Sequence, residues 1–142
     1  MESRKQIAAE KLMCGTHNCA QAVICTYADI IGIDEETARN LGNSFGAGMG
    51  NMEGTCGALV GAGIVLGMAT KDKTMARKGM RQIMTQFQQS NGATQCKLLK
   101  GVGTGVALRE CSGCVADAAE FLEEQLLAIQ SIGYSASQTP LE

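Results

Sequence analysis

Apolar residues recur at spacings of three and four along most of the chain, and no stretch keeps strict polar–apolar alternation for more than a few residues. A spacing of three and four is that of one face of an α-helix, whereas alternation is typical of a half-buried strand. Asn18, Asp34 and Asp72 precede three of the helical stretches, and such short polar side chains cap helix N-termini. The pattern predicts an all-α fold, with helices near residues 2–12, 18–31, 35–44, 55–69, 73–91 and 111–129 and a short helical turn at 96–100.

The most apolar segment, Cys56 to Ala69, is too short for a membrane span, which needs roughly 20 residues. It also carries four glycines, each of which costs a helix about 1 kcal/mol relative to alanine. Small residues spaced in this way let a neighbouring backbone approach closely. We therefore expect this segment to form a glycine-rich, buried central helix, with Gly57, Gly61, Gly63 and Gly67 along it.

The length of 142 residues corresponds to one domain with a sizeable core. We expect a compact bundle of about five to six helices over residues 1–130, followed by a polar C-terminal tail at 131–142. Leu141 and Glu142 match the start of a Leu-Glu-polyhistidine expression tag, so we interpret them as a tag remnant and leave them out of the fold prediction.

The charge of the chain disfavours a nucleic-acid partner. The formal net charge is −2, and the basic run at 71–81 has the spacing of one solvated helix face. The N-terminal residues are polar and lack the apolar stretch of a secretory signal, which predicts a cytoplasmic location.

Seven cysteines are the most informative part of the composition: Cys14, Cys19, Cys25, Cys56, Cys96, Cys111 and Cys114. The cytosol keeps thiols reduced, and the odd count and irregular spacing fit neither a disulfide ladder nor a paired zinc knuckle. A buried packing role for any single cysteine is the simple alternative.

Helix geometry separates these cysteines further. Cys56 falls in the first turn of the central helix, where backbone amides and the helix dipole stabilise a thiolate and lower its pKa. Cys19 and Cys96 also fall near predicted helix starts, while Cys111 and Cys114 project from one helix face. His17, the only histidine, precedes Cys19 by two residues and is either an activating base or a solvated side chain.

Three segments, NCAQAV at 18–23, FGAGMG at 45–50 and TCGALVGA at 55–62, resemble the C_GCAxxG_C_C family of redox-active proteins. The CGAxxG element is the specific part, and the resemblance covers nearly the whole chain. It assigns the four characteristic cysteines to Cys19, Cys56, Cys96 and Cys111, with Cys114 as a substitute for the last. Cys14, Cys25 and Cys114 are additions to the family pattern.

The resemblance implies redox activity, and with the helix starts it predicts that Cys19, Cys56, Cys96 and Cys111 meet in one pocket. In the first hypothesis, a low-pKa Cys56 attacks a disulfide and a second cysteine resolves the intermediate. In the second, the four thiolates hold an iron–sulfur cluster in an electron carrier or sensor. A structural zinc site and a non-catalytic binding module are further alternatives. The implied partner is a redox protein or a small disulfide or thiol, and homodimer formation is left open.

Overall fold

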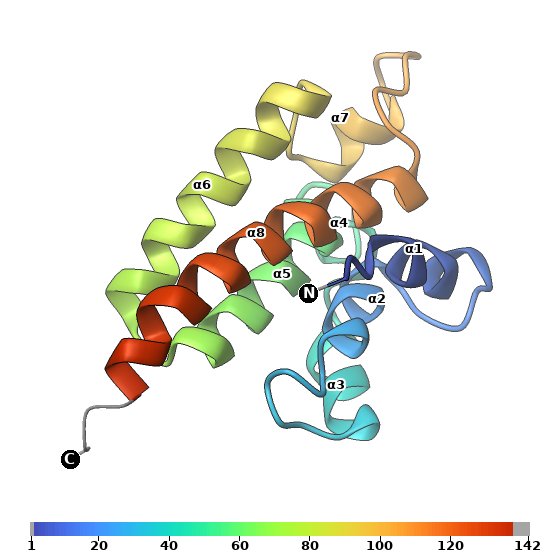
Figure 1. Ribbon diagram of the computed structural model, residues 1–142. Helices are drawn as coiled ribbons and strands as arrows, with labels where there is room; N and C mark the ends of the chain where they lie inside the picture. The colour runs from blue at the N-terminus through green and yellow to red at the C-terminus, as the bar shows by residue number, and fades with distance from the viewer. Residues whose placement is uncertain (1, 138–142) are drawn as a thin grey trace.

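The computed structural model describes residues 2–137, with side chains described as far as residue 131. This part of the chain is helical and contains no strand, which confirms the predicted all-α class (Figure 1). Six longer helices are joined by two short ones, α4 and α7. The helices are α1 (Lys5–Met13), α2 (Cys19–Thr26), α3 (Glu35–Gly42), α4 (Gly46–Met49), α5 (Gly57–Thr70), α6 (Lys73–Asn91), α7 (Cys96–Lys100) and α8 (Cys111–Ser137).

The predicted helix caps are present. Asn18 forms a capping box with Gln21 at the start of α2, and its side chain accepts from the Gln21 amide at 2.8 Å. Asp34 accepts from the Thr37 amide at 2.8 Å, and Asp72 accepts from the Met75 amide at 3.0 Å. These contacts fix where α2, α3 and α6 begin.

Helix α5 packs against α2, α6 and α8, as the predicted central helix should. Figure 1 shows α5, α6 and α8 running along one another, with α1, α2 and α3 gathered at one end of this group. A Cβ added at Gly61 would lie 2.7 Å from the Ala20 carbonyl oxygen, and one at Gly57 would lie 2.5 Å from the Phe45 carbonyl oxygen. At Gly67 it would meet nothing within 4 Å. Close packing therefore explains the first two of these glycines and not the last.

Two helix ends differ from the sequence-based prediction. Helix α2 ends at Thr26. Residues 27–32 form tight turns, and Gly32 at the end of these turns has φ +73°. Helix α8 does not end near Ile129 but runs to Ser137, so much of the expected polar tail at 131–142 is helical. The first proline after Cys111 is Pro140, so no strong terminator interrupts the helix earlier. Residues 138–142, including Leu141 and Glu142, lie outside the described part of the chain.

A buried contact fixes α2 against α8. The Tyr27 hydroxyl donates a hydrogen bond to the Glu123 carboxylate, which also accepts from the Arg4 backbone amide at 2.7 Å. Burial and the neighbouring carboxylate raise the pKa of Tyr27, so the hydroxyl keeps its proton and remains a donor. This arrangement sets the relative position of the two helices that carry Cys19 and Cys111. Within residues 2–137, no helix has both the length and the apolar character needed to cross a membrane.

Candidate functional site

A small pocket collects five cysteines from four parts of the fold. Its lining includes the four cysteines predicted as site residues, together with Cys114, Lys100 and Arg109. Cys19 begins α2, Cys56 is the residue before α5, Cys96 begins α7, and Cys111 begins α8. The cavity volume is about 10 Å³, which is space for about one water molecule. The five pocket cysteines are Cys19, Cys56, Cys96, Cys111 and Cys114.

Backbone pairing holds Cys56 beside Cys96. Thr55 and Gln95 form an isolated antiparallel bridge. Cys56 and Cys96 are the residues that directly follow these two, so the bridge brings the two cysteines together. The Cys56 amide donates to the Thr94 carbonyl at 2.8 Å, and the Cys96 amide donates to the Gly54 carbonyl at 3.0 Å. Two sulfurs that are far apart in sequence are thereby fixed by main-chain hydrogen bonds.

The glycine-rich loop before α5 closes one side of the pocket. Gly48 has φ +54°, and a Cβ there would lie 2.4 Å from the Cys96 Cβ atom. Ala47, Met49 and Met52 also have positive φ values of 50°, 66° and 65°. Such conformations cost energy in residues other than glycine and often accompany functional sites. The loop therefore packs directly on Cys96.

Cys19 and Cys111 form an outer pair, and both are partly exposed. The Cys19 side chain and the nearby Lys100 ammonium both stabilise the anion of Cys111. These two interactions outweigh partial burial and lower the pKa of Cys111 to about 6. The same contact raises the pKa of Cys19, because its proton is shared with the Cys111 anion. The two side chains therefore titrate as a pair, in which Cys111 forms the thiolate more readily.

Cys56 and Cys114 form an inner pair, with residue exposures of 5% and 3%. The Cys114 side chain and the backbone amides of Ala58 and Leu59 at the start of α5 stabilise the anion of Cys56. Together they lower the pKa of Cys56 against the effect of burial, whereas the pKa of Cys114 is raised by Cys56 and by burial. The helix-start effect predicted for Cys56 is present, but the sulfur is buried.

Cys96 differs from the two pairs. It is buried, with 5% exposure, and burial is the main cause that raises its pKa. The nearby Lys100 ammonium opposes this rise. Cys96 therefore lacks the interaction with a second cysteine side chain that pairs the other four pocket cysteines.

The pocket sulfurs do not form a preformed zinc site. Zn–S bonds of about 2.3 Å place the sulfurs of a tetrahedral site about 3.8 Å apart. Among the described residues, the one group of three or more candidate ligand atoms lying within 4.8 Å of one another is His17, Cys25 and Glu35, outside this pocket. The pocket sulfurs are instead arranged as an outer and an inner pair.

The remaining candidates lie elsewhere. Cys14 is exposed and Cys25 is buried, and neither lines the pocket. His17 contacts the Thr16 hydroxyl at 2.7 Å and the Glu35 carboxylate at 3.3 Å, so its hydrogen bonds go to these groups and not to Cys19.

Sequence reasoning did not identify the pairing of Cys114 with Cys56, or the role of Lys100. The spacing of Cys111 and Cys114 by one helical turn indicated that both face the same side. A single lysine at the end of a short helix carried no comparable signal.

A family model described as "Putative redox-active protein (C_GCAxxG_C_C)" matches residues 17–125, a span that contains all five pocket cysteines. No curated protein and no solved structure gives a significant match to the chain.

Proposed function

The chain belongs to the C_GCAxxG_C_C family, and on that premise we propose that it performs thiol–disulfide exchange at the five-cysteine pocket. The observation that carries this proposal is that the partly exposed Cys19 and Cys111 line one pocket with Lys100, whose ammonium helps to lower the pKa of Cys111. A thiolate is the attacking species in exchange, and a neighbouring thiol is needed to release the product. The outer pair supplies both in a partly exposed position.

The reaction begins when the Cys111 thiolate attacks one sulfur of a disulfide substrate. An S–S bond forms between Cys111 and the substrate, and the other half of the substrate leaves as a thiolate. The leaving thiolate takes the Cys19 proton, and the Cys19 sulfur then attacks the Cys111 sulfur. This second step forms a Cys19–Cys111 disulfide and releases the second half of the substrate as a thiolate. The protein is oxidised by two electrons and the substrate disulfide is reduced.

Attack by Cys111 replaces the earlier expectation of attack by Cys56. An attacking sulfur must be reachable by the substrate, and Cys56 is only 5% exposed. In the proposed reaction Cys56 and Cys114 are a second, inner dithiol, and Cys96 packs beside them. We propose a cytoplasmic setting, where the reducing environment returns the outer pair to the dithiol state.

The first experiment measures the reaction of the reduced protein with oxidised glutathione, in a Cys14→Ser background that removes the exposed thiol. We expect two glutathiones released per protein and one internal disulfide formed. Cys19→Ser should stop the reaction at a mixed disulfide on Cys111, whereas Cys111→Ser should not react at this pocket. An unchanged rate in Cys111→Ser would reject the proposal.

A second experiment tests the cluster and zinc alternatives directly. Anaerobically purified protein is analysed for iron and zinc and by ultraviolet–visible spectroscopy. We expect no visible sulfur-to-iron absorption and no stoichiometric iron. Stoichiometric iron with a visible chromophore would instead assign the chain as a cluster-binding electron carrier. Metal-free protein with inert pocket thiols would favour a non-catalytic binding module.

A further inference from the structure

A second group of reactive side chains lies away from the pocket, where the segment before α2 meets α2 and α3. His17 precedes α2, Cys25 lies near its end, and Glu35 is the first residue of α3. One ligand atom from each of these residues lies within 4.8 Å of the other two. None of the three lines the five-cysteine pocket, so its proposed reaction does not explain them.

The spacing of these atoms fits a tetrahedral metal ion. The His17 Nε2 atom is 3.3 Å from Glu35 Oε2. Zinc bonds to imidazole nitrogen and carboxylate oxygen are about 2.0–2.1 Å, which in tetrahedral geometry places those two ligands about 3.3 Å apart. Cys25 adds a sulfur, so the three residues offer the nitrogen, sulfur and oxygen donors that zinc accepts.

The hydrogen bonds of Thr16 fix the orientation of the histidine. The Thr16 hydroxyl lies 3.3 Å from the Lys11 carbonyl oxygen and 2.7 Å from His17 Nδ1. His17 Nε2 points at a carboxylate oxygen of Glu35. In the tautomer that carries its proton on Nδ1, the Nε2 lone pair faces this carboxylate, and a cation between the two atoms would be bound by both. Metal-binding histidines are commonly held in this way through the other ring nitrogen.

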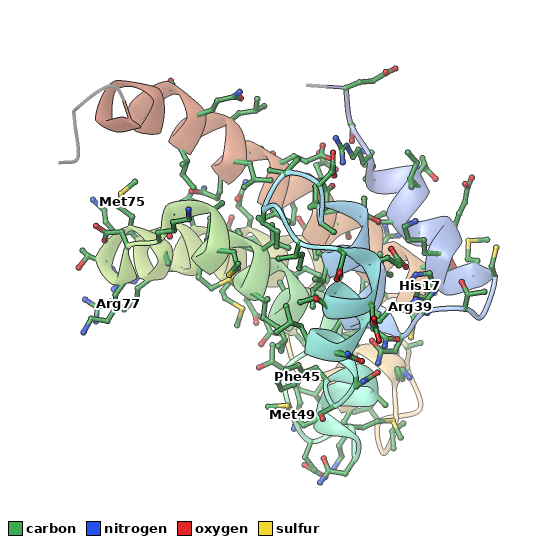
Figure 2. The ribbon with its side chains drawn as sticks, turned by 90° about the horizontal axis from the view of Figure 1, so that it is seen from below. His17, Arg39, Phe45, Met49, Met75 and Arg77 are labelled. Carbon is green, nitrogen blue, oxygen red and sulfur yellow. The ribbon has the colours of Figure 1, made fainter. Side chains whose placement is uncertain are left out.

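Arg39 holds the carboxylate in place. Its Nε atom is 3.1 Å from Glu35 Oε2, and its Nη1 atom donates to the Thr16 carbonyl at 2.9 Å. The same guanidinium therefore anchors Glu35 and the segment that carries His17, and Figure 2 shows His17 and Arg39 side by side. Ligating carboxylates commonly accept such outer hydrogen bonds. Arg39 also adds a positive charge, which the anions of Glu35 and Cys25 must offset.

We propose that His17, Cys25 and Glu35 bind a zinc-type divalent cation. With three protein ligands, a water molecule would take the fourth position of a tetrahedral zinc ion. The Glu35 side chain is 55% exposed, so solvent reaches the site from its side. Binding exchanges the Cys25 proton for the metal, because a cysteine ligates zinc as the thiolate. One S–Zn bond forms and one proton is released to solvent. The ion would join the segment before α2 to α3, close to Cys19.

The test uses the imidazole of His17, which is the only one in the chain and therefore gives a single set of nuclear magnetic resonance signals. Zinc is added to the full-length protein under a phosphine reductant until the pocket thiols are also saturated. We expect the Nε2 resonance to move to a metal-bound position while Nδ1 stays protonated. Because only His17 is observed, zinc bound at the five-cysteine pocket does not affect the readout, and the outcome is independent of the proposed exchange reaction.

Matched variants decide the assignment. Cys25→Ser should abolish the shift of His17, and Glu35→Gln should weaken zinc binding at least tenfold. Glu36→Gln, which changes the neighbouring exposed acid, and Cys111→Ser, which changes the pocket, should keep the full response. Melting temperatures confirm that each variant is folded. If Cys25→Ser unfolds the protein, Glu35→Gln still tests the site, because Glu35 is exposed and its replacement should not disturb the core. Unchanged His17 signals in excess zinc, or equal shifts in all variants, would reject the site and leave a hydrogen bond between His17 and Glu35.

Discussion

Cys19 at the start of α2 and Cys111 at the start of α8 line the same pocket, and the interaction between their side chains lowers the pKa of Cys111. A thiol that donates to another sulfur stabilises the anion of its partner, and here the Lys100 ammonium adds to that effect. The two cysteines therefore differ in how readily they form the thiolate, although both line the same pocket.

The first prediction concerns the pH dependence of Cys111 alkylation. A pKa of about 6 makes about 90% of Cys111 a thiolate at pH 7, compared with a few per cent for an ordinary cysteine with a pKa of about 8.5. In the Cys14→Ser background, iodoacetamide should label Cys111 first, and the rate should fall by half near pH 6. Peptide mass spectrometry across pH 5 to 9 measures this profile. A midpoint above pH 8 would show that the surrounding groups do not stabilise the anion.

The second prediction concerns Lys100. Replacing it with methionine removes a positive charge beside Cys111 and should raise the pKa of that thiol by about one unit. The alkylation rate at pH 6 should then fall several-fold, while Lys100→Arg should retain most of the original rate. If the alkylation rates of Lys100→Met and the parent protein depended on pH in the same way, the low pKa of Cys111 would be due to Cys19 alone.

The third prediction compares two glycines of α5. Gly61→Ala should destabilise the fold by about 1–3 kcal/mol, because its Cβ would lie 2.7 Å from the Ala20 carbonyl oxygen of α2. Gly67→Ala has open space and should stabilise the helix by about 0.5–1 kcal/mol. Urea denaturation under reducing conditions measures both changes. If both variants were stabilised, α2 would not pack on α5 at this distance.

The fourth prediction concerns the loop that covers Cys96. Gly48→Ala should push the loop away, because its Cβ would lie 2.4 Å from the Cys96 Cβ atom. Cys96 should then react faster with iodoacetamide. Gly50→Ala is the control, because Gly50 also has positive φ, +88°, but has nothing within 4 Å. That change should cost about 1–2 kcal/mol in backbone strain without exposing Cys96. Equal labelling of Cys96 in both variants would mean that the loop does not protect it.

The sequence was sufficient for those features that depend on local patterns. Asn18, Asp34 and Asp72 identified three helix starts, because capping involves residues only a few positions away. The apolarity and the glycines of 56–69 identified the central helix. The end of α2 at Thr26 was missed, because a series of turns keeps the same apolar spacing as a helix.

Features that depend on distant contacts could not be predicted in the same way. The Thr55–Gln95 bridge, the position of Lys100 and the pairing of Cys56 with Cys114 arise only when separate helices pack together. The burial of Cys56 is of the same kind: its place at the start of α5 predicted a stabilised anion but gave no information about access. For this reason the partly exposed Cys111, and not the buried Cys56, is the proposed attacking residue.

The most direct test of the central claim is the order in which disulfides form. Reduced protein in the Cys14→Ser background is oxidised with a limited amount of diamide, digested without reduction and mapped by mass spectrometry. We expect the Cys19–Cys111 disulfide to form first and the buried Cys56–Cys114 disulfide second, with Cys96 remaining a free thiol. A first disulfide that joins Cys111 to Cys114, or that includes Cys96, would contradict the assignment of Cys19 and Cys111 as the exchange pair.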